Sequence, residues 1–351
     1  MALGQGNGSR YRLLGPTGLR VSEICLGTMT FGTDWGWGAE EDECARILDA
    51  YREAGGNFLD TASNYTNGSS EQILGRLTAA DRDRWVIATK YTLSIDRADP
   101  NAGGNHRKSL VRALERSLRS LQTDYVDLLW LHMRDATTPI EEIIRALDDQ
   151  VRLGKVLYVG ISDSPAWVAA RANAIAELRG WSPFVALQLP YSLASRDPER
   201  ELLPMAAELG LTVMAWGVLE AGALAGRAPE TLRWPGDLTE RDRLAAAAVE
   251  EVAEELGTAP GTVAIAWILH RRRPDVLPIV GVRSAGQLAE NLAAATLDLS
   301  PEHLARLDEA AAPALGFPRS FLESDGVREL IYGETWPSLV QRWSAPSPGR
   351  G

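Results

Sequence analysis

The chain has 351 residues, of which 45% are hydrophobic and 24% charged, a composition typical of a soluble globular protein. Its formal net charge of −11 argues against nucleic acid as a partner, because phosphate backbones require clustered lysine and arginine. The only two cysteines, Cys25 and Cys44, do not indicate a disulfide framework.

The ends of the chain carry no recognisable targeting or membrane segment. Residues 1–9 are rich in glycine and lack the apolar core of a signal peptide, and no apolar stretch approaches the length of a membrane span. We therefore expect a cytoplasmic protein without a membrane partner. Residues 1–9 and 345–351 are expected to be flexible tails around one domain at 10–344.

The first elements form a predicted hairpin. Residues 11–14 and 19–22 have strand character and flank the turn sequence Gly-Pro-Thr-Gly at 15–18. Strand and helix patterns then alternate to the end of the domain. The pattern predicts a (β/α)8 barrel with a C-terminal extension, in which the hairpin plugs the bottom and each helix supplies a right-handed crossover. The expected strand ends lie near Gly27, Asp60, Thr89, Leu131, Ser162, Gln188, Ala215 and Val280.

Helix starts are marked by a hydroxyl residue followed by proline. Thr138-Pro139-Ile140-Glu141 predicts an N-cap, a first-turn proline and a capping-box glutamate, with the helix ending near Gly154. Ser164-Pro165 and Ser300-Pro301 repeat the signal. The interval of 65 residues from Ala215 to Val280 is much longer than the intervals between the other expected strand ends. It is expected to hold two helices, a glycine-rich stretch and a loop around Trp234-Pro235-Gly236, and long loops at a barrel mouth usually serve ligands.

Three of the apolar runs end in an ionisable residue. Asp60, Lys90 and His132 each close a predicted strand, and Tyr65 lies five positions after Asp60. Parallel strands bring their carboxyl ends to one mouth, so these four side chains are expected to meet there. Asp60 and Lys90 alone could equally form a structural ion pair, and a lone His132 would more often be a core histidine. The full set favours a catalytic site.

Together the four residues suit the protonation of a carbonyl oxygen. We expect the Lys90 ammonium to favour the phenolate and lower the pKa of Tyr65 from its usual value near 10. Asp60 would hold Lys90, and His132 could hydrogen-bond the reacting oxygen. No side chain carries hydride, so a nicotinamide cofactor is implied.

These residues carry a resemblance to the aldo-keto reductases, in the branch that includes aryl-alcohol dehydrogenases and potassium-channel β subunits. The resemblance runs from about Tyr11 to Trp336. Its motifs, in order, are Gly-Thr-Met-Thr-Phe-Gly (27–32), Leu-Asp-Thr-Ala-Ser-Asn-Tyr (59–65), Ala-Thr-Lys-Tyr (88–91), Leu-His (131–132), Gly-Ile-Ser-Asp (160–163) and Pro-Ile-Val-Gly-Val-Arg-Ser (278–284). The resemblance implies hydride transfer from NADPH to an aldehyde or ketone, with Tyr65 as general acid and no metal.

The resemblance also implies a cofactor site. Ser162, Asp163 and Gln188 would bind the nicotinamide carboxamide, and Trp216 would stack on its ring. The backbone from Gly217 to Leu219 would approach the pyrophosphate, and Gly281 would also bind the cofactor. Arg283 and Ser284 would take the 2′-phosphate, which favours NADPH over NADH because arginine suits bidentate phosphate recognition. The residues expected to flank the adenosine are Gln287, Glu290 and Asn291.

Two departures from the family pattern fall in this site. Many relatives have Trp-Ser-Pro-Leu-Gly-Gly where this chain has Trp-Gly-Val-Leu-Glu-Ala at 216–221, so a hydroxyl is missing and the charge of Glu220 is added. Asp163 stands where asparagine is frequent, which removes one amide donor. We expect altered cofactor affinity rather than abolished binding.

Aromatic residues after the first strand suggest a wall for the substrate. Two tryptophans in the glycine-rich loop at 31–38 are unusual as core packing, and they would suit a bulky apolar or aromatic carbonyl compound. The residues expected to contact this small-molecule substrate are Phe31, Trp35, Trp37, Tyr91, Met133 and Arg134.

One other function remains open from the sequence, and a further one is disfavoured. An NADPH-binding regulatory or sensor subunit with slow or no turnover would keep the same four residues, as the potassium-channel β subunits do. A metal-dependent barrel hydrolase would need a ligand cluster with suitable spacing, which the sequence lacks. The sequence leaves open whether the chain forms a homo-oligomer, and it does not identify the natural carbonyl compound.

Overall fold

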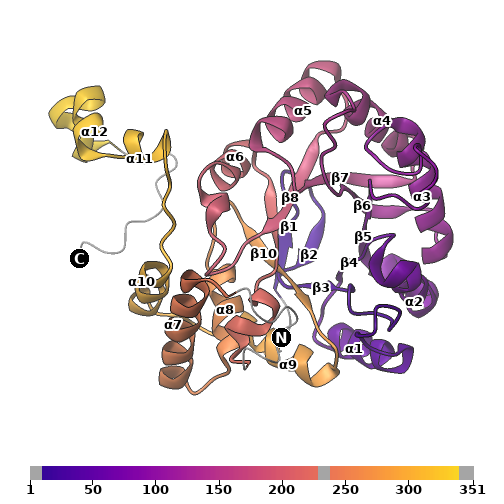
Figure 1. Cartoon of the computed structure of the whole chain (residues 1–351), viewed down its shortest axis with the longest axis horizontal. Helices are drawn as coiled ribbons and strands as arrows, with labels where there is room; N and C mark the ends of the chain where they lie inside the picture. The colour runs from indigo at the N-terminus through magenta and orange to yellow at the C-terminus, as the bar shows by residue number, and fades with distance from the viewer. Residues whose placement is uncertain (1–9, 228–237, 340–351) are drawn as a thin grey trace, which may run out of the picture.

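A computed structural model describes residues 10–227 and 238–339. The expected loop at Trp234-Pro235-Gly236 and both expected tails lie outside these residues. Within the described residues, eight parallel strands close into a barrel in the order β10-β3-β4-β5-β6-β7-β8-β9, as the sequence predicted (Figure 1). The strands are β3 (Cys25–Gly27), β4 (Phe58–Asp60), β5 (Val86–Tyr91), β6 (Val126–Leu131), β7 (Val156–Ser162), β8 (Phe184–Pro190), β9 (Thr212–Trp216) and β10 (Val276–Gly281).

The barrel divides the core into two apolar clusters. One fills the barrel and includes Phe58, Val86 and Leu128, while the other lies between the strands and the helices and includes Leu59 and Ile87. Successive strand residues alternate between these clusters because side chains along a strand point to opposite faces. The same alternation decides which polar residues reach the interior.

The N-terminal hairpin closes the bottom of the barrel, as predicted. Its strands are β1 (Tyr11–Leu13) and β2 (Arg20–Ser22), which pair antiparallel. Leu14 and Val21 are fully buried in the cluster that fills the barrel. Gly15 has φ +55, and a Cβ there would lie 2.0 Å from the Val185 carbonyl oxygen, so only glycine fits this close approach.

Helices cover the outside of the barrel (Figure 1). They are α1 (Glu41–Glu53), α2 (Ser69–Thr78), α3 (Arg107–Leu121), α4 (Ile140–Arg152), α5 (Ala166–Arg179), α6 (Leu202–Leu209), α7 (Glu240–Leu256), α8 (Pro260–Leu269), α9 (Ala285–Leu292) and α10 (Pro301–Ala310). Helices α7 and α8 are the two expected in the long interval after β9. Short 3₁₀ segments connect several elements, among them η1 (Tyr65–Gly68), η2 (Ala79–Arg84), η3 (Asp197–Glu199), η4 (Glu220–Ala225) and η6 (Ala293–Ala295).

The predicted helix starts are only partly confirmed. Ser300 caps α10 and completes a capping box with His303. The capping box predicted for α4 is wrong, because the Thr138 hydroxyl donates to Asp135 in the preceding loop and no side chain caps that helix. Ser164 likewise donates to the Ser162 carbonyl instead of capping α5. In both cases a nearby loop acceptor competes for the hydroxyl.

After α10 the chain leaves the barrel. Residues 313–339, called the C-terminal arm below, carry α11 (Arg319–Leu322), α12 (Asp325–Tyr332) and η7 (Gly333–Ser338). Figure 1 shows α11 and α12 standing apart from the body of the molecule. Across 10–227 and 238–339, none of the helices has the length and apolar character needed to cross a bilayer.

Candidate active site

The four predicted catalytic residues gather at the carboxyl end of the barrel. Asp60 ends β4, Lys90 lies near the end of β5, His132 follows β6, and Tyr65 opens η1 in the loop after β4. The parallel registers of β4 with β5 and of β5 with β6 place these strand ends side by side. The spacing in the sequence therefore becomes proximity in space.

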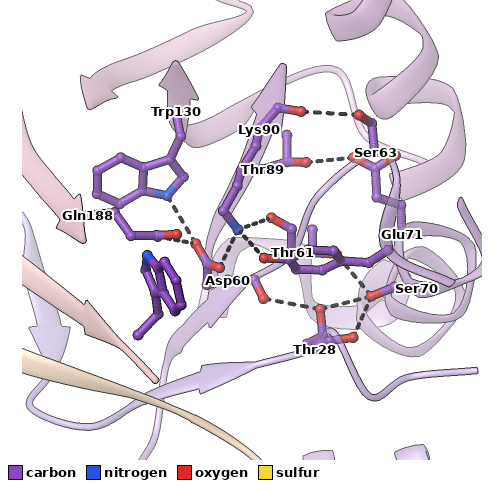
Figure 2. A network of polar contacts seen from close by, with 12 residues as sticks. Thr28, Asp60, Thr61, Ser63, Ser70, Glu71, Thr89, Lys90, Trp130 and Gln188 are labelled. Carbon is purple, nitrogen blue, oxygen red and sulfur yellow. Dashed lines mark hydrogen bonds and ion pairs between the residues drawn. The ribbon is translucent and has the colours of Figure 1, made fainter. Parts of the chain in front are cut away.

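The Lys90 ammonium is the centre of the site (Figure 2). Its Nζ lies 2.5 Å from Asp60 Oδ2, 2.8 Å from the Thr61 carbonyl oxygen and 3.0 Å from the Tyr65 hydroxyl oxygen. The Lys90 side chain is fully buried and that of Asp60 is 4% exposed. All three donor positions of the ammonium are thus occupied, which fixes its direction toward Tyr65.

The second oxygen of Asp60 is also held. Oδ1 accepts from Trp130 Nε1 at 3.0 Å and from Gln188 Nε2 at 2.9 Å. Trp130 pairs in register with Gly160, where a Cβ would meet the indole at 2.3 Å, so the glycine makes room for the ring. Gln188 was expected at the nicotinamide. Its side-chain amide nitrogen orients the carboxylate that holds Lys90.

A layer of hydroxyl groups supports the loop that carries Tyr65 (Figure 2). Ser70 donates to the Thr28 carbonyl oxygen at 2.7 Å and lies 3.0 Å from the Thr61 hydroxyl. Thr89, next to Lys90, donates to Glu71 at 2.6 Å. These bonds tie β3, β4, β5 and α2 together behind the site, which limits the freedom of the catalytic side chains.

The electrostatics of Tyr65 differ from the expectation. Burial raises the pKa of Tyr65, and the Lys90 ammonium opposes that rise without overcoming it, so the prediction of a lowered pKa is wrong. Burial also disfavours the charge on Lys90, but Asp60 and Tyr65 outweigh it and the pKa of Lys90 is raised. The site therefore holds a neutral phenol beside a permanent ammonium, an arrangement that can donate a proton and stabilise the phenolate left behind.

His132 is held neutral. It is 9% exposed, and burial, followed by the charge of Lys90, lowers the pKa of His132 from 6.5 to about 3. Between pH 6.5 and about 3, the unfolded chain therefore binds a proton at His132 that the folded chain does not bind. Stability from this group is lost as the pH falls from 6.5 toward 3.

We predict that the imidazole of His132 does not titrate as the pH is lowered from about 8 to about 5. Its ring-proton resonance, assigned by comparison with a His132→Gln variant, should keep the chemical shift of a neutral ring. A titration midpoint near the ordinary value for histidine would contradict the buried, neutral assignment.

A cleft of about 380 Å³ lies at the barrel mouth on the side of β10. Five of the predicted cofactor residues line it: Gly217, Leu219, Gly281, Arg283 and Gln287. Arg227 also lines it, and sequence reasoning did not find this residue. The stem of Arg227 passes within 2.7 Å of the position that a Cβ of Gly222 would take. The only signal in the sequence was a basic residue after a glycine-rich loop.

The nicotinamide residues predicted on β7, β8 and β9 are neighbours in space. Ser162 pairs in register with Gln188, and Asp163 lies 3.3 Å from Trp216 Nε1 through its Oδ1. The buried Ser162 hydroxyl has no hydrogen-bond partner of good geometry among the described residues, and the Trp216 residue is 40% exposed. The two arginines that line the cleft suit the phosphates of a dinucleotide. Trp216, whose exposed ring could stack on a nicotinamide, directly precedes the cleft residue Gly217.

Glu220 does not face this cleft. Its carboxylate accepts a hydrogen bond from the Ser192 hydroxyl, and burial raises its pKa. The turn requires positive φ at Glu220 (+44), Ala221 (+56) and Gly222 (+114), which rotates the side chain away while the backbone lines the cleft. The added charge is therefore removed from the predicted pyrophosphate position.

Helix α9 begins beside the cleft. The Ser284 hydroxyl caps the helix by accepting from the Gln287 amide, so in this structure it serves the helix. The Ala285 amide donates to Glu43 of α1 at 2.9 Å. Of the remaining predicted adenosine residues, Glu290 is exposed and Asn291 is buried, and neither lines the cleft.

The structure brings only some of the predicted substrate residues to the mouth. Phe31 and Tyr91 are buried in the cluster between strands and helices, away from the interior. The side chain of Arg134 is engaged with Asp135 and the Thr138 carbonyl. Trp35 and Trp37 contact each other with ring centroids 5.6 Å apart, and Trp37 lines the cleft. Met133 is 41% exposed beside His132.

Comparisons with known proteins identify the family of the chain. The family model described as the aldo/keto reductase family matches residues 23–312. Norsolorinic acid reductase stcV of Emericella nidulans is 41% identical over 96% of this chain and 93% of its own length. Norsolorinic acid reductase A of Aspergillus parasiticus is 40% identical over 89% and 84%. Aryl-alcohol dehydrogenase [NADP(+)] of Phanerodontia chrysosporium is 38% identical over 88% of both chains.

Proposed function

The chain belongs to the aldo/keto reductase family, and on that premise we propose that it reduces aromatic aldehydes or ketones with NADPH, using Tyr65 as the proton donor. It is an oxidoreductase of the nicotinamide-dependent kind. The observation that carries the finer proposal is the Lys90 ammonium, which contacts both Asp60 and the Tyr65 hydroxyl at the barrel mouth.

The mechanism follows from the order of these contacts. When bound, a dihydronicotinamide cofactor would supply the hydride. The Tyr65 hydroxyl donates its proton to the carbonyl oxygen as that oxygen gains charge. Lys90 stabilises the resulting phenolate, and Asp60 keeps Lys90 charged and directed. Neutral His132 borders the same space and can hydrogen-bond the reacting oxygen without adding charge.

NADPH is favoured over NADH by the basic lining of the cleft. Arg283 lies where α9 begins, and Arg227 lies over the loop at Gly222. We assign Arg283 to the 2′-phosphate and Arg227 to the pyrophosphate, because these are the two guanidinium groups that the cleft presents within the described residues.

We predict that Arg283→Ala weakens NADPH binding by roughly 10- to 100-fold and leaves NADH binding nearly unchanged, since one charged hydrogen-bonding group is lost. Arg227→Ala is the matched control and should weaken both cofactors equally, because both contain the pyrophosphate. Titration of the quenching of protein fluorescence measures each affinity. If Arg283→Ala lost affinity for NADPH and for NADH equally, the assignment of Arg283 to the 2′-phosphate would be contradicted.

An aromatic substrate is favoured by the residues around the mouth. Trp35, Trp37 and the exposed Trp216 offer ring faces, and aromatic pairs gain energy beyond simple burial. One relative is named as an aryl-alcohol dehydrogenase. An aryl aldehyde is therefore the substrate class we propose first.

Oxidation of NADPH in the presence of a panel of aryl and alkyl aldehydes and ketones tests the proposed function. Turnover with kcat/KM highest for aryl aldehydes would support it. Tight NADPH binding with no turnover of any carbonyl compound would contradict it and support the alternative of a cofactor-sensing subunit.

A further inference from the structure

The C-terminal arm concentrates exposed apolar side chains. Of the sixteen large hydrophobic residues that are exposed among those described, seven fall in this short segment. They range from 43% exposed at Tyr332 to 86% at Leu330, and the set is Phe317, Phe321, Leu322, Leu330, Ile331, Tyr332 and Leu339. Exposed apolar side chains gathered in one segment are typical of an interaction site in a globular protein.

The arm has no core of its own. Helices α11 and α12 are four and eight residues long and contain no buried residue. Isolated helices of this length are marginal in water, because nucleation costs more than a few hydrogen bonds return. Local contacts between Tyr332 and Trp336, with ring centroids 4.8 Å apart, and between Phe317 and Phe321, at 6.2 Å, cover little of this surface.

The barrel of the same chain does not cover the arm either. Two polar attachments hold its base: Arg319 donates to the Glu199 carbonyl, and Arg200 Nε donates to the Ala314 carbonyl oxygen at 2.9 Å. Beyond them α11 and α12 stand clear of the barrel (Figure 1). The base is therefore fastened in a direction that carries the apolar residues outward, where a second molecule can reach them.

We propose that the C-terminal arm is a dimerisation element that packs against the arm of a second copy of this chain. The seven side chains offer on the order of 700 Å², close to the roughly 800 Å² that each partner buries in a stable interface. An arm that meets its own counterpart across a two-fold axis uses one patch on both subunits, so a single sequence supplies both halves of the contact.

The charges of the arm predict how this association responds to salt. Residues 313–339 carry four carboxylates, at 323, 325, 329 and 334, and two arginines, at 319 and 328. Two arms therefore bring an excess of like charge together. Because ions screen that repulsion, added salt should strengthen the dimer, whereas a contact made by opposite charges would weaken.

The proposal is tested on the full chain by sedimentation equilibrium of Leu330→Asp beside the matched control Leu178→Asp. Leu330 is 86% exposed on the arm, and Leu178 is 85% exposed on α5, so neither substitution costs core packing. We expect the unaltered protein and Leu178→Asp to be dimers at micromolar concentration. Leu330→Asp should be a monomer.

Three results would overturn the proposal: an unaltered protein that stays monomeric, a Leu330→Asp variant that still dimerises, or a Leu178→Asp variant that dissociates equally. Hydrogen exchange locates the contact independently. Amides at 325–332 should become more protected as the protein concentration rises. Protection that does not depend on concentration would show that the arm contacts only its own chain.

Discussion

Replacing Tyr65 with phenylalanine should lower kcat for aryl aldehyde reduction by roughly 100- to 10,000-fold, the range that a positioned proton donor contributes. The ring stays in place and the ammonium of Lys90 remains beside it, so NADPH affinity should be unchanged. Stopped-flow measurement of NADPH oxidation, with cofactor affinity measured separately, checks both parts. The loss should appear in kcat and not in cofactor binding, because the hydroxyl acts when the carbonyl oxygen gains charge.

Tyr91→Phe is the control for this experiment. Tyr91 is adjacent in sequence to Lys90 and 1% exposed, and its hydroxyl has no hydrogen-bond partner among the described residues. It lies in the apolar cluster between the strands and the helices and not at the barrel mouth. This variant should keep full activity. If Tyr91→Phe loses turnover while Tyr65→Phe retains it, the phenol has been assigned to the wrong residue.

Replacing Lys90 with methionine should have the second large effect, on stability as well as on turnover. The substitution leaves the buried Asp60 carboxylate without its cation, and breaking a buried pair by removing one partner costs about 3–5 kcal/mol. The phenolate left by proton donation also loses its counter-charge, so kcat should fall with it. Urea unfolding and steady-state kinetics measure the two losses.

A double variant separates the structural from the catalytic role of Lys90. Asp60→Asn in the Lys90→Met background removes the unpaired charge while keeping an acceptor for Trp130 and Gln188. Part of the lost stability should return, and turnover should not. If the stability lost in the double variant equals the sum of the losses in Lys90→Met and Asp60→Asn, the Asp60–Lys90 contact is not the coupled pair described here.

The strand ends and the four catalytic residues could be predicted from the sequence because each lies in a regular, strongly apolar context. Asp60, Lys90 and His132 follow parallel strands, and parallel strands must deliver their ends to one mouth. The hairpin plug was predictable for a similar reason, since the turn sequence at 15–18 allows little else. These features depend on local periodicity and on the closure of the barrel.

The features that were predicted wrongly or missed depend on the direction in which a side chain points and on competing effects at one group. Tyr91 immediately follows Lys90, so strand alternation places the two side chains on opposite faces. The expectation that Tyr91 contacts the substrate, which depended on its adjacency to Lys90 in the sequence, therefore failed. The orientation of Glu220 follows from positive φ at three successive residues, which no motif encodes. The sign of the pKa shift of Tyr65 depends on whether burial exceeds the effect of Lys90, and only the folded structure decides that balance.

Transfer of deuterium from C4 of NADPH to the carbonyl carbon of an aryl aldehyde is the decisive test of the proposed reaction. NADPH labelled on either face in turn, followed by mass spectrometry of the alcohol, reports whether hydride passes to the substrate at this site. We predict label in the alcohol from one face only with the unaltered enzyme, and greatly reduced label with Tyr65→Phe. Bound NADPH that never passes deuterium to any aldehyde in the panel would contradict the proposed hydride transfer.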